Sequence, residues 1–156
     1  MERHEAITRL KKYFDIRELV SKDVYNKFGQ TAWRLFDTRL LETILVLREE
    51  ILKVPLVCNN WKSGGTLTQR GFRENIAQIV WSKTNAGTLY VSAHCIGQGV
   101  DLSSSKMSAD DMRNTIGLNA RKLPYNVRIE NKQGAPTWLH IDVMTEPDST
   151  AKISWF

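Results

Sequence analysis

The fold is expected to form around one stretch of sequence, Ser92-Ala93-His94-Cys95-Ile96-Gly97-Gln98-Gly99-Val100-Asp101. It places an imidazole and a carboxylate on either side of a turn that contains two glycines. A later stretch, Trp138-Leu139-His140-Ile141-Asp142, supplies a second imidazole within an apolar run that predicts a buried strand. Two histidines and one aspartate are a plausible ligand set for zinc. Three protein ligands leave a fourth position open for water, as in a catalytic zinc site.

Spacing alone leaves the role of these residues open. For each histidine taken singly, a hydrogen-bonded, half-buried side chain is the simpler interpretation, and the spacing lacks the specificity of an HExxH motif. However, Trp138, His140 and Asp142 share one face of the predicted strand, because alternate side chains of a strand point the same way. A polar face on an otherwise apolar strand favours a binding role.

The composition is that of a globular protein with a basic surface. The chain has 156 residues, of which 42% are hydrophobic and 25% charged, and this predicts one domain, 1–156, with its own core. Its net charge of +5 favours an anionic partner, such as bacterial cell wall, acidic lipid or nucleic acid. None of the nucleic-acid-binding motif patterns occurs, so a nucleic-acid partner is not expected.

The sequence predicts neither a membrane span nor a secretory signal. No apolar run approaches the roughly 20 residues that cross a bilayer. The first residues, Met1-Glu2-Arg3-His4-Glu5, are charged, so synthesis in the cytoplasm without a signal peptide is expected. Two cysteines, Cys58 and Cys95, are too few for a disulfide framework and are expected to be buried, reduced thiols.

Residues 1–53 predict a helical scaffold, and residues 54–156 predict the core that carries the chemistry. The clearest helix extends over about 31–52, with Thr31 as its N-cap and apolar residues at i, i+3, i+4 spacing. Further helices are expected at 74–81 and 108–122, and strands at 56–58, 88–93, 100–102, 127–130, 138–143 and 153–156. The strands 127–130 and 138–143 are expected to form a hairpin.

The motifs resemble those of a known peptidase family. Ser92-x-His94-x-x-Gly97-x-Gly99-x-Asp101, followed by Trp138-x-His140, is similar to the SxHxxGxAxD and WxH motifs of the M15 family. That family groups D-alanyl-D-alanine carboxypeptidases, phage endolysin peptidases and the hedgehog signalling domain. The similarity covers about residues 54–144 and keeps the order His, Asp, His, while Gly99 replaces the usual alanine.

This resemblance implies a small α+β fold, in which an antiparallel sheet carries a metal cleft and packs against the N-terminal helices. Residues 54–156 would then be a metallopeptidase-like core. His94, Asp101 and His140 would be the ligands of one Zn²⁺ per chain. Zinc over another divalent ion is an expectation from the ligand set, because N/O sites bind several metals.

The resemblance also implies a carboxylate general base. In many relatives this is a glutamate three residues before the last histidine, a position that Thr137 occupies here. Glu130 is the candidate instead, because the hairpin can bring its strand beside that of His140 and because one branch of the family has a glutamate after a similar Leu-Pro-Tyr segment. Asp142 is the second choice and could instead orient a ligand.

Further roles follow from the same resemblance. Arg73, or failing it Arg70, would bind an oxyanion or a substrate carboxylate. Ser92 could donate a hydrogen bond in the cleft, and Trp138 could form one wall of it. The expected activity is hydrolysis of stem or crossbridge peptides of peptidoglycan, by an endolysin-like endopeptidase or a D,D-carboxypeptidase. The enzyme would be a monomer, and a phage lysis system would release it to the wall.

Two other functions are consistent with the sequence. A catalytically inactive member of the fold, with or without zinc, would act as a binding protein, and the absence of glutamate at position 137 favours this alternative. A phage structural or nucleic-acid-associated protein is supported only by the charge, and its binding would weaken steeply with salt without any need for metal.

Overall fold

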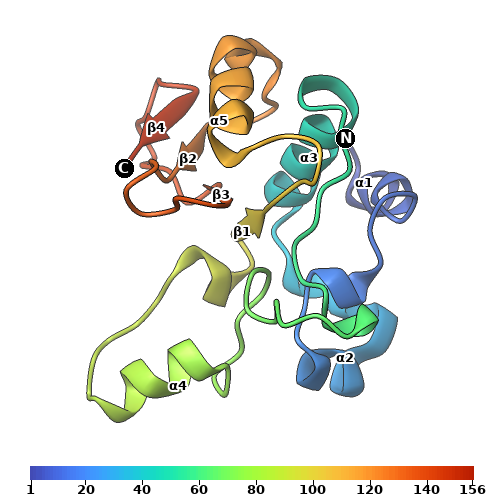
Figure 1. The fold of residues 1–156 in the computed structure, drawn as a ribbon, viewed down its shortest axis with the longest axis vertical. Helices are drawn as coiled ribbons and strands as arrows, with labels where there is room; N and C mark the ends of the chain where they lie inside the picture. The colour runs from blue at the N-terminus through green and yellow to red at the C-terminus, as the bar shows by residue number, and fades with distance from the viewer.

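The computed structural model describes residues 1–156 and has an α+β fold (Figure 1). Five α-helices and four short strands make up its regular structure. The helices are α1 (Arg3–Leu10), α2 (Lys22–Phe28), α3 (Thr38–Val46), α4 (Gln78–Asn85) and α5 (Ala109–Leu118). The strands are β1 (Gly99–Leu102), β2 (Val127–Ile129), β3 (Leu139–Asp142) and β4 (Ile153–Trp155). No helix combines the length and the apolar character that crossing a bilayer requires.

The strands form one mixed sheet with the order β1-β3-β2-β4. The predicted hairpin is confirmed, since β2 and β3 are antiparallel, and β1 is antiparallel to β3. The expectation of a wholly antiparallel sheet is wrong, because the edge strand β4 is parallel to β2. The connection from β3 to β4 skips β2 in the order of the sheet. Because β4 runs opposite to β3, as β2 does, β4 is parallel to β2.

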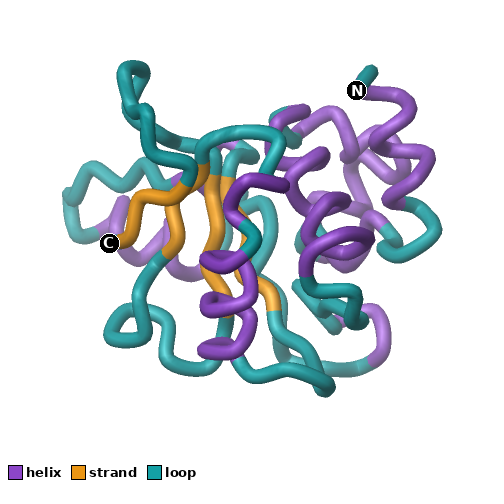
Figure 2. Tube along the Cα trace, turned by 90° about the horizontal axis from the view of Figure 1, so that it is seen from above, coloured by secondary structure: helices purple, strands orange, loops and turns teal.

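One apolar core joins the helical part of the chain to the sheet. Figure 2 shows the strands side by side in one half of the molecule and the N-terminal helices in the other. A single cluster of buried apolar side chains extends from α1 and α3 to the strands β1, β2 and β3. On α3, Leu40, Leu41, Ile44 and Leu45 are buried, as the i, i+3, i+4 spacing predicted. The helices therefore support the sheet from behind.

The predicted long helix is interrupted at its start. A 3₁₀ segment covers Gly29–Leu35, Phe36 is extended, and α3 begins only after Asp37. The Asp37 carboxylate accepts the backbone N–H of Arg39, so Asp37 rather than Thr31 is the N-cap. After α3 the chain continues as one π-helical turn, Leu47–Ile51.

Other local predictions are confirmed in part. Ser108 is the N-cap of α5, which lies within the helix predicted at 108–122, and a 3₁₀ turn, Ala120–Lys122, completes that helix. The helix expected at 74–81 lies later in the chain, as α4. The expected strand 56–58 is reduced to one bridge between Val57 and Ser103, and the expected strand 88–93 pairs with nothing. Both segments have residues typical of strands, but a strand forms only beside a neighbouring strand, and the chain supplies none at these two places.

Both cysteines are free thiols, as predicted. Cys58 is fully buried, and this burial raises the pKa of its thiol. Cys95, on the 3₁₀ turn Ala93–Ile96, is only half-buried, so the expectation of a buried thiol is wrong there.

Gly97 fixes the turn between His94 and β1. Its φ is +69°, a left-handed conformation that glycine adopts without strain. A Cβ at this position would collide with the carbonyl oxygen of Leu35, while the Gly97 carbonyl accepts the N–H of Asp37 at 2.9 Å. The motif glycine therefore permits close packing of the turn against the start of α3.

We expect Gly97→Ala to lower the free energy of unfolding by more than about 3 kcal/mol, because left-handed strain adds to a backbone collision. Gly87→Ala is the matched control, since Gly87 has the same φ of +69° but no atom near its missing Cβ. Its cost should be the conformational strain alone, about 1–2 kcal/mol. Urea unfolding of both variants checks this, and equal losses would contradict the packing role of Gly97.

Candidate metal centre

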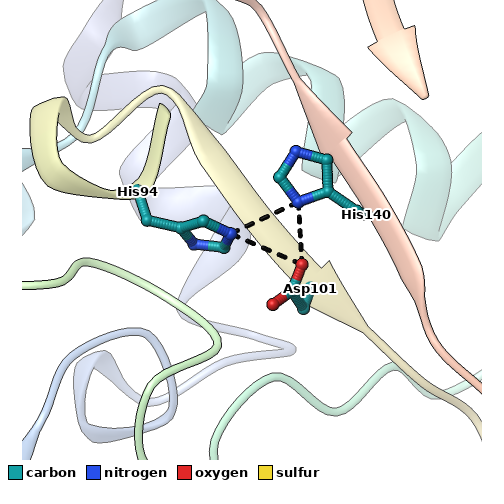
Figure 3. Close-up of side chains that lie close together, drawn as sticks. All are labelled: His94, Asp101 and His140. Atoms are coloured by element: carbon teal, nitrogen blue, oxygen red, sulfur yellow. Dashed lines mark hydrogen bonds and ion pairs between the residues drawn. The ribbon is translucent and has the colours of Figure 1, made fainter. Parts of the chain in front are cut away.

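Three elements bring His94, Asp101 and His140 together (Figure 3). His94 lies on the 3₁₀ turn Ala93–Ile96, Asp101 on β1 and His140 on β3. Asp101 and His140 are directly paired across the sheet, so their side chains point to the same face. All three side chains are buried. The structure therefore brings together the three residues that the sequence predicted as metal ligands, in a group that could hold an ion.

The spacing of the three ligand atoms suits a tetrahedral ion. The distance from His94 Nε2 to His140 Nδ1 is 3.3 Å, and that from His94 Nε2 to Asp101 Oδ1 is 3.4 Å. A tetrahedral zinc with bonds of about 2.0–2.2 Å holds its ligands about 3.3–3.6 Å apart. The third distance, from His140 Nδ1 to Asp101 Oδ1, is 2.8 Å, and a small rotation of Asp101 would lengthen it. The donor set and its geometry therefore fit a zinc ion.

Partners behind the two imidazoles determine which nitrogen faces the centre. The Nδ1–H of His94 donates to the carbonyl oxygen of Gly71 at 2.8 Å, which leaves Nε2 to bind. His140 is oriented the other way, with Nε2 at 3.0 Å from Asp142 Oδ2 and Nδ1 toward the centre. Metal-bound histidines usually donate their second N–H to a carbonyl or carboxylate in this manner.

Asp142 is held by three partners at once, which are Arg128, His140 and the backbone N–H of Met144. Its carboxylate is fully buried and accepts two hydrogen bonds from Arg128, at 2.9 and 3.0 Å, in addition to the contact with His140. Burial alone would raise the pKa of Asp142, but hydrogen bonds from His140 and Arg128 outweigh it and lower the pKa. These contacts suit a residue that orients His140, the second of the two roles that the sequence left open for Asp142.

The same charges act on the ligands themselves. Burial lowers the pKa of His140, but its hydrogen bonds to Asp101 and Asp142 have the opposite and larger effect, and the pKa rises to about 9. Burial raises the pKa of Asp101, whereas hydrogen bonds from both histidines bring it below its ordinary value. Asp101 is thus ionised, and a cation that binds at His140 has to displace a proton.

The centre opens into a cleft of about 450 Å³. Ser92, Glu130 and Trp138, which the sequence analysis assigned to a cleft at this site, all line it. Glu130 follows β2 and faces the His140 strand, because its backbone N–H donates to the His140 carbonyl at 3.3 Å. The Glu130 carboxylate occupies the space that a Cβ at Gly134 would need, so the glycine allows the carboxylate to lie there. The cleft therefore carries a carboxylate beside the metal ligands.

The two candidate arginines occupy different places. Arg73 lines the cleft, donates to Asp101 Oδ2 at 3.2 Å and to the Tyr90 hydroxyl at 3.0 Å, and so contacts a ligand directly. Arg70 lies in an adjoining hollow, where its guanidinium is 5.8 Å from the Trp138 ring centre and donates to Ser103. Arg73 is the better placed to act at the centre.

Sequence reasoning missed three residues that contact the site. Arg128 binds Asp142, Phe156 packs edge-on against the His140 ring at 5.9 Å, and the Gly71 carbonyl orients His94. Arg128 could have been found, because it is two residues before Glu130 and therefore shares its face of β2. Phe156 and Gly71 depend on the tertiary fold and leave no local signal.

We expect zinc affinity to rise with pH. Because the pKa of His140 is raised to about 9, binding releases a proton below that pH, and the association constant should grow by about tenfold per pH unit between pH 7 and 8.5. Competition with a chelator measures this slope. The Asp142→Asn substitution removes one cause of the raised His140 pKa. The increase of zinc affinity with pH should therefore level off at a lower pH in this variant than in the wild type. An affinity independent of pH would contradict the assignment of His140.

Comparison with protein-family models, curated proteins and solved structures gives no significant match to any of them. The interpretation of this site therefore rests on its own geometry and on the motif pattern in the sequence.

Proposed function

We propose that this protein is a zinc-dependent peptidase whose metal is held by His94, Asp101 and His140. One observation carries the proposal: three buried candidate ligand atoms lie within 4.8 Å of one another, two of their separations suit a tetrahedral zinc, and their residues line an open cleft. Three protein ligands leave one position for water or substrate, which distinguishes a catalytic zinc from a structural one. The M15-like order of the motifs supports the same assignment.

The residues of the cleft have complementary roles in this proposal. A zinc ion bound there would lower the pKa of a coordinated water toward about 7 and polarise the scissile carbonyl. Glu130 accepts the proton of the attacking water and passes it to the leaving amine. Arg73 holds the second oxygen of Asp101 and presents its guanidinium to the negative charge that develops on the carbonyl oxygen. Asp142, fixed by Arg128, keeps His140 in its binding orientation.

The proposed substrates are stem or crossbridge peptides of bacterial peptidoglycan. The net charge of +5 suits an anionic polymer, and the motif pattern resembles that of wall peptidases. Arg70, stacked on Trp138 beside the cleft, is placed to meet a substrate carboxylate. Delivery to the wall by a phage lysis system belongs to the same proposal.

The first test is metal content. After zinc loading and desalting, mass spectrometry of untagged protein should find about one zinc per chain, because the three ligands form one site. His140→Gln should lose the zinc, and His4→Gln, which changes an exposed histidine far from the centre, should retain it. Circular dichroism confirms that each variant is folded. A folded wild-type protein without zinc would refute the peptidase proposal.

The second test separates a catalyst from an inactive binding protein. Glu130→Gln should keep its zinc but hydrolyse stem peptides about 10²- to 10⁴-fold more slowly, because an amide cannot accept the water proton. Glu146→Gln, an exposed site outside the cleft, is the matched control and should cleave at the wild-type rate. A zinc-loaded wild-type protein that binds wall peptides without cleaving them would favour the inactive member of the fold.

A further inference from the structure

One segment beside the metal centre has backbone groups without partners. Between α4 and the 3₁₀ turn that carries His94, neither the N–H nor the C=O of Leu89, Tyr90 or Val91 makes a hydrogen bond. The N–H of Ser92 is also unpaired. Figure 1 shows the chain following an open path at the side of the molecule here. The sequence of this segment is typical of a strand, yet no strand of the protein pairs with it.

The segment nevertheless has the form of a strand. Exposure alternates along it, with Leu89 and Val91 at 91% and 58% while Tyr90 and Ser92 are half-buried. Such a period of two is that of an extended chain. Ser92 itself is extended, with φ −100° and ψ 165°.

Contacts at both ends and in the middle hold the segment in place. The N–H of Thr88 donates to Lys83 at the end of α4, and Ser92 accepts the N–H of Cys95. In the middle, Arg73 donates to the Tyr90 hydroxyl at 3.0 Å while it also binds Asp101. A row of free donors and acceptors is therefore fixed to the same arginine that contacts a metal ligand.

The segment also forms one wall of the cleft. Tyr90, Val91 and Ser92 line it, and Glu130 and Trp138 line it from the β2–β3 side. A peptide whose scissile bond lies at the centre would thus run alongside these free backbone groups. An exposed edge of this kind is a template for one more strand.

We propose that residues 89–92 bind the substrate by strand addition, so that main-chain amides of an extended peptide pair with this edge. The inference rests on the proposed peptidase function and extends it to the mode of substrate recognition. Stem peptides of peptidoglycan combine L- and D-residues, and their main-chain amides are available for hydrogen bonds whatever the side chains are. A protein that pairs with the main chain of such peptides can bind them without deep pockets for their side chains.

Hydrogen exchange tests the inference directly. The zinc-loaded Glu130→Gln protein is mixed with the pentapeptide L-Ala-γ-D-Glu-L-Lys-D-Ala-D-Ala, and exchange of the amides of residues 88–92 is followed. We expect alternate amides of this segment to exchange more slowly with the peptide, because only every second N–H of a strand faces one neighbour. The amides of residues 145, 146 and 148–150, which do not line the cleft, serve as the internal control.

The outcomes separate this inference from the proposed function. Cleavage by the wild-type protein without protection of residues 89–92 would overturn strand addition and leave the peptidase standing. Protection without cleavage by the zinc-loaded wild-type protein would support strand addition in a binding protein. If the protein shows no cleavage and no protection, both the peptidase proposal and strand addition are overturned.

A pair of proline variants gives a second measurement. Successive N–H groups of a strand point in opposite directions, so one of Tyr90→Pro and Val91→Pro should remove a bond to the peptide. Each proline variant is compared with the alanine variant at the same position, all in the Glu130→Gln background. The proline that removes the bond should weaken peptide binding about 2- to 12-fold relative to its alanine control, which is the effect of one hydrogen bond. Retained zinc shows that each centre is intact. No difference within either pair would overturn strand addition.

Discussion

The pairing of Asp101 with His140 across β1 and β3 is the constraint on which the site depends. It brings a carboxylate and an imidazole from distant parts of the chain onto one face of the sheet, at 2.8 Å. A slip of one residue would turn His140 to the opposite, aliphatic face. The buried apolar side chains on that face, Val100, Leu139 and Ile141, fix the register, so the hydrophobic core also determines the position of the candidate metal ligands.

The two buried carboxylates of the centre, Asp101 and Asp142, are each neutralised by an arginine. Asp101 contacts Arg73, and Asp142 contacts Arg128, so each buried carboxylate has a guanidinium partner as well as a histidine. Burying an ionised carboxylate without such partners would cost several kcal/mol. The centre is thus a network in which each ligand is held by a second residue, and this preorganisation is what a metal site requires.

Local patterns in the sequence predicted much of the site and less of the fold. The alternation around His140 predicted its strand and shared face, and the hairpin predicted Glu130 beside it, because both follow from periods of two residues. The strand 153–156 was predicted, but its parallel pairing with β2 and the lack of a partner for segment 89–92 were not, since strand pairing is decided by segments far away in the chain. The interruption of the long helix depended on Asp37, whose capping bond competed with a continuous apolar pattern.

The centre draws on four separate parts of the chain, near Gly71, His94, Asp101 and His140. Loops must close over long sequence separations before these groups meet, and such non-local contacts slow folding. An unfolded chain cannot present the same ligand set, so an ion bound here would stabilise the native state in proportion to the logarithm of its concentration. Metal supply would then set the lifetime of the protein against heat and proteolysis, and chelation would shorten it.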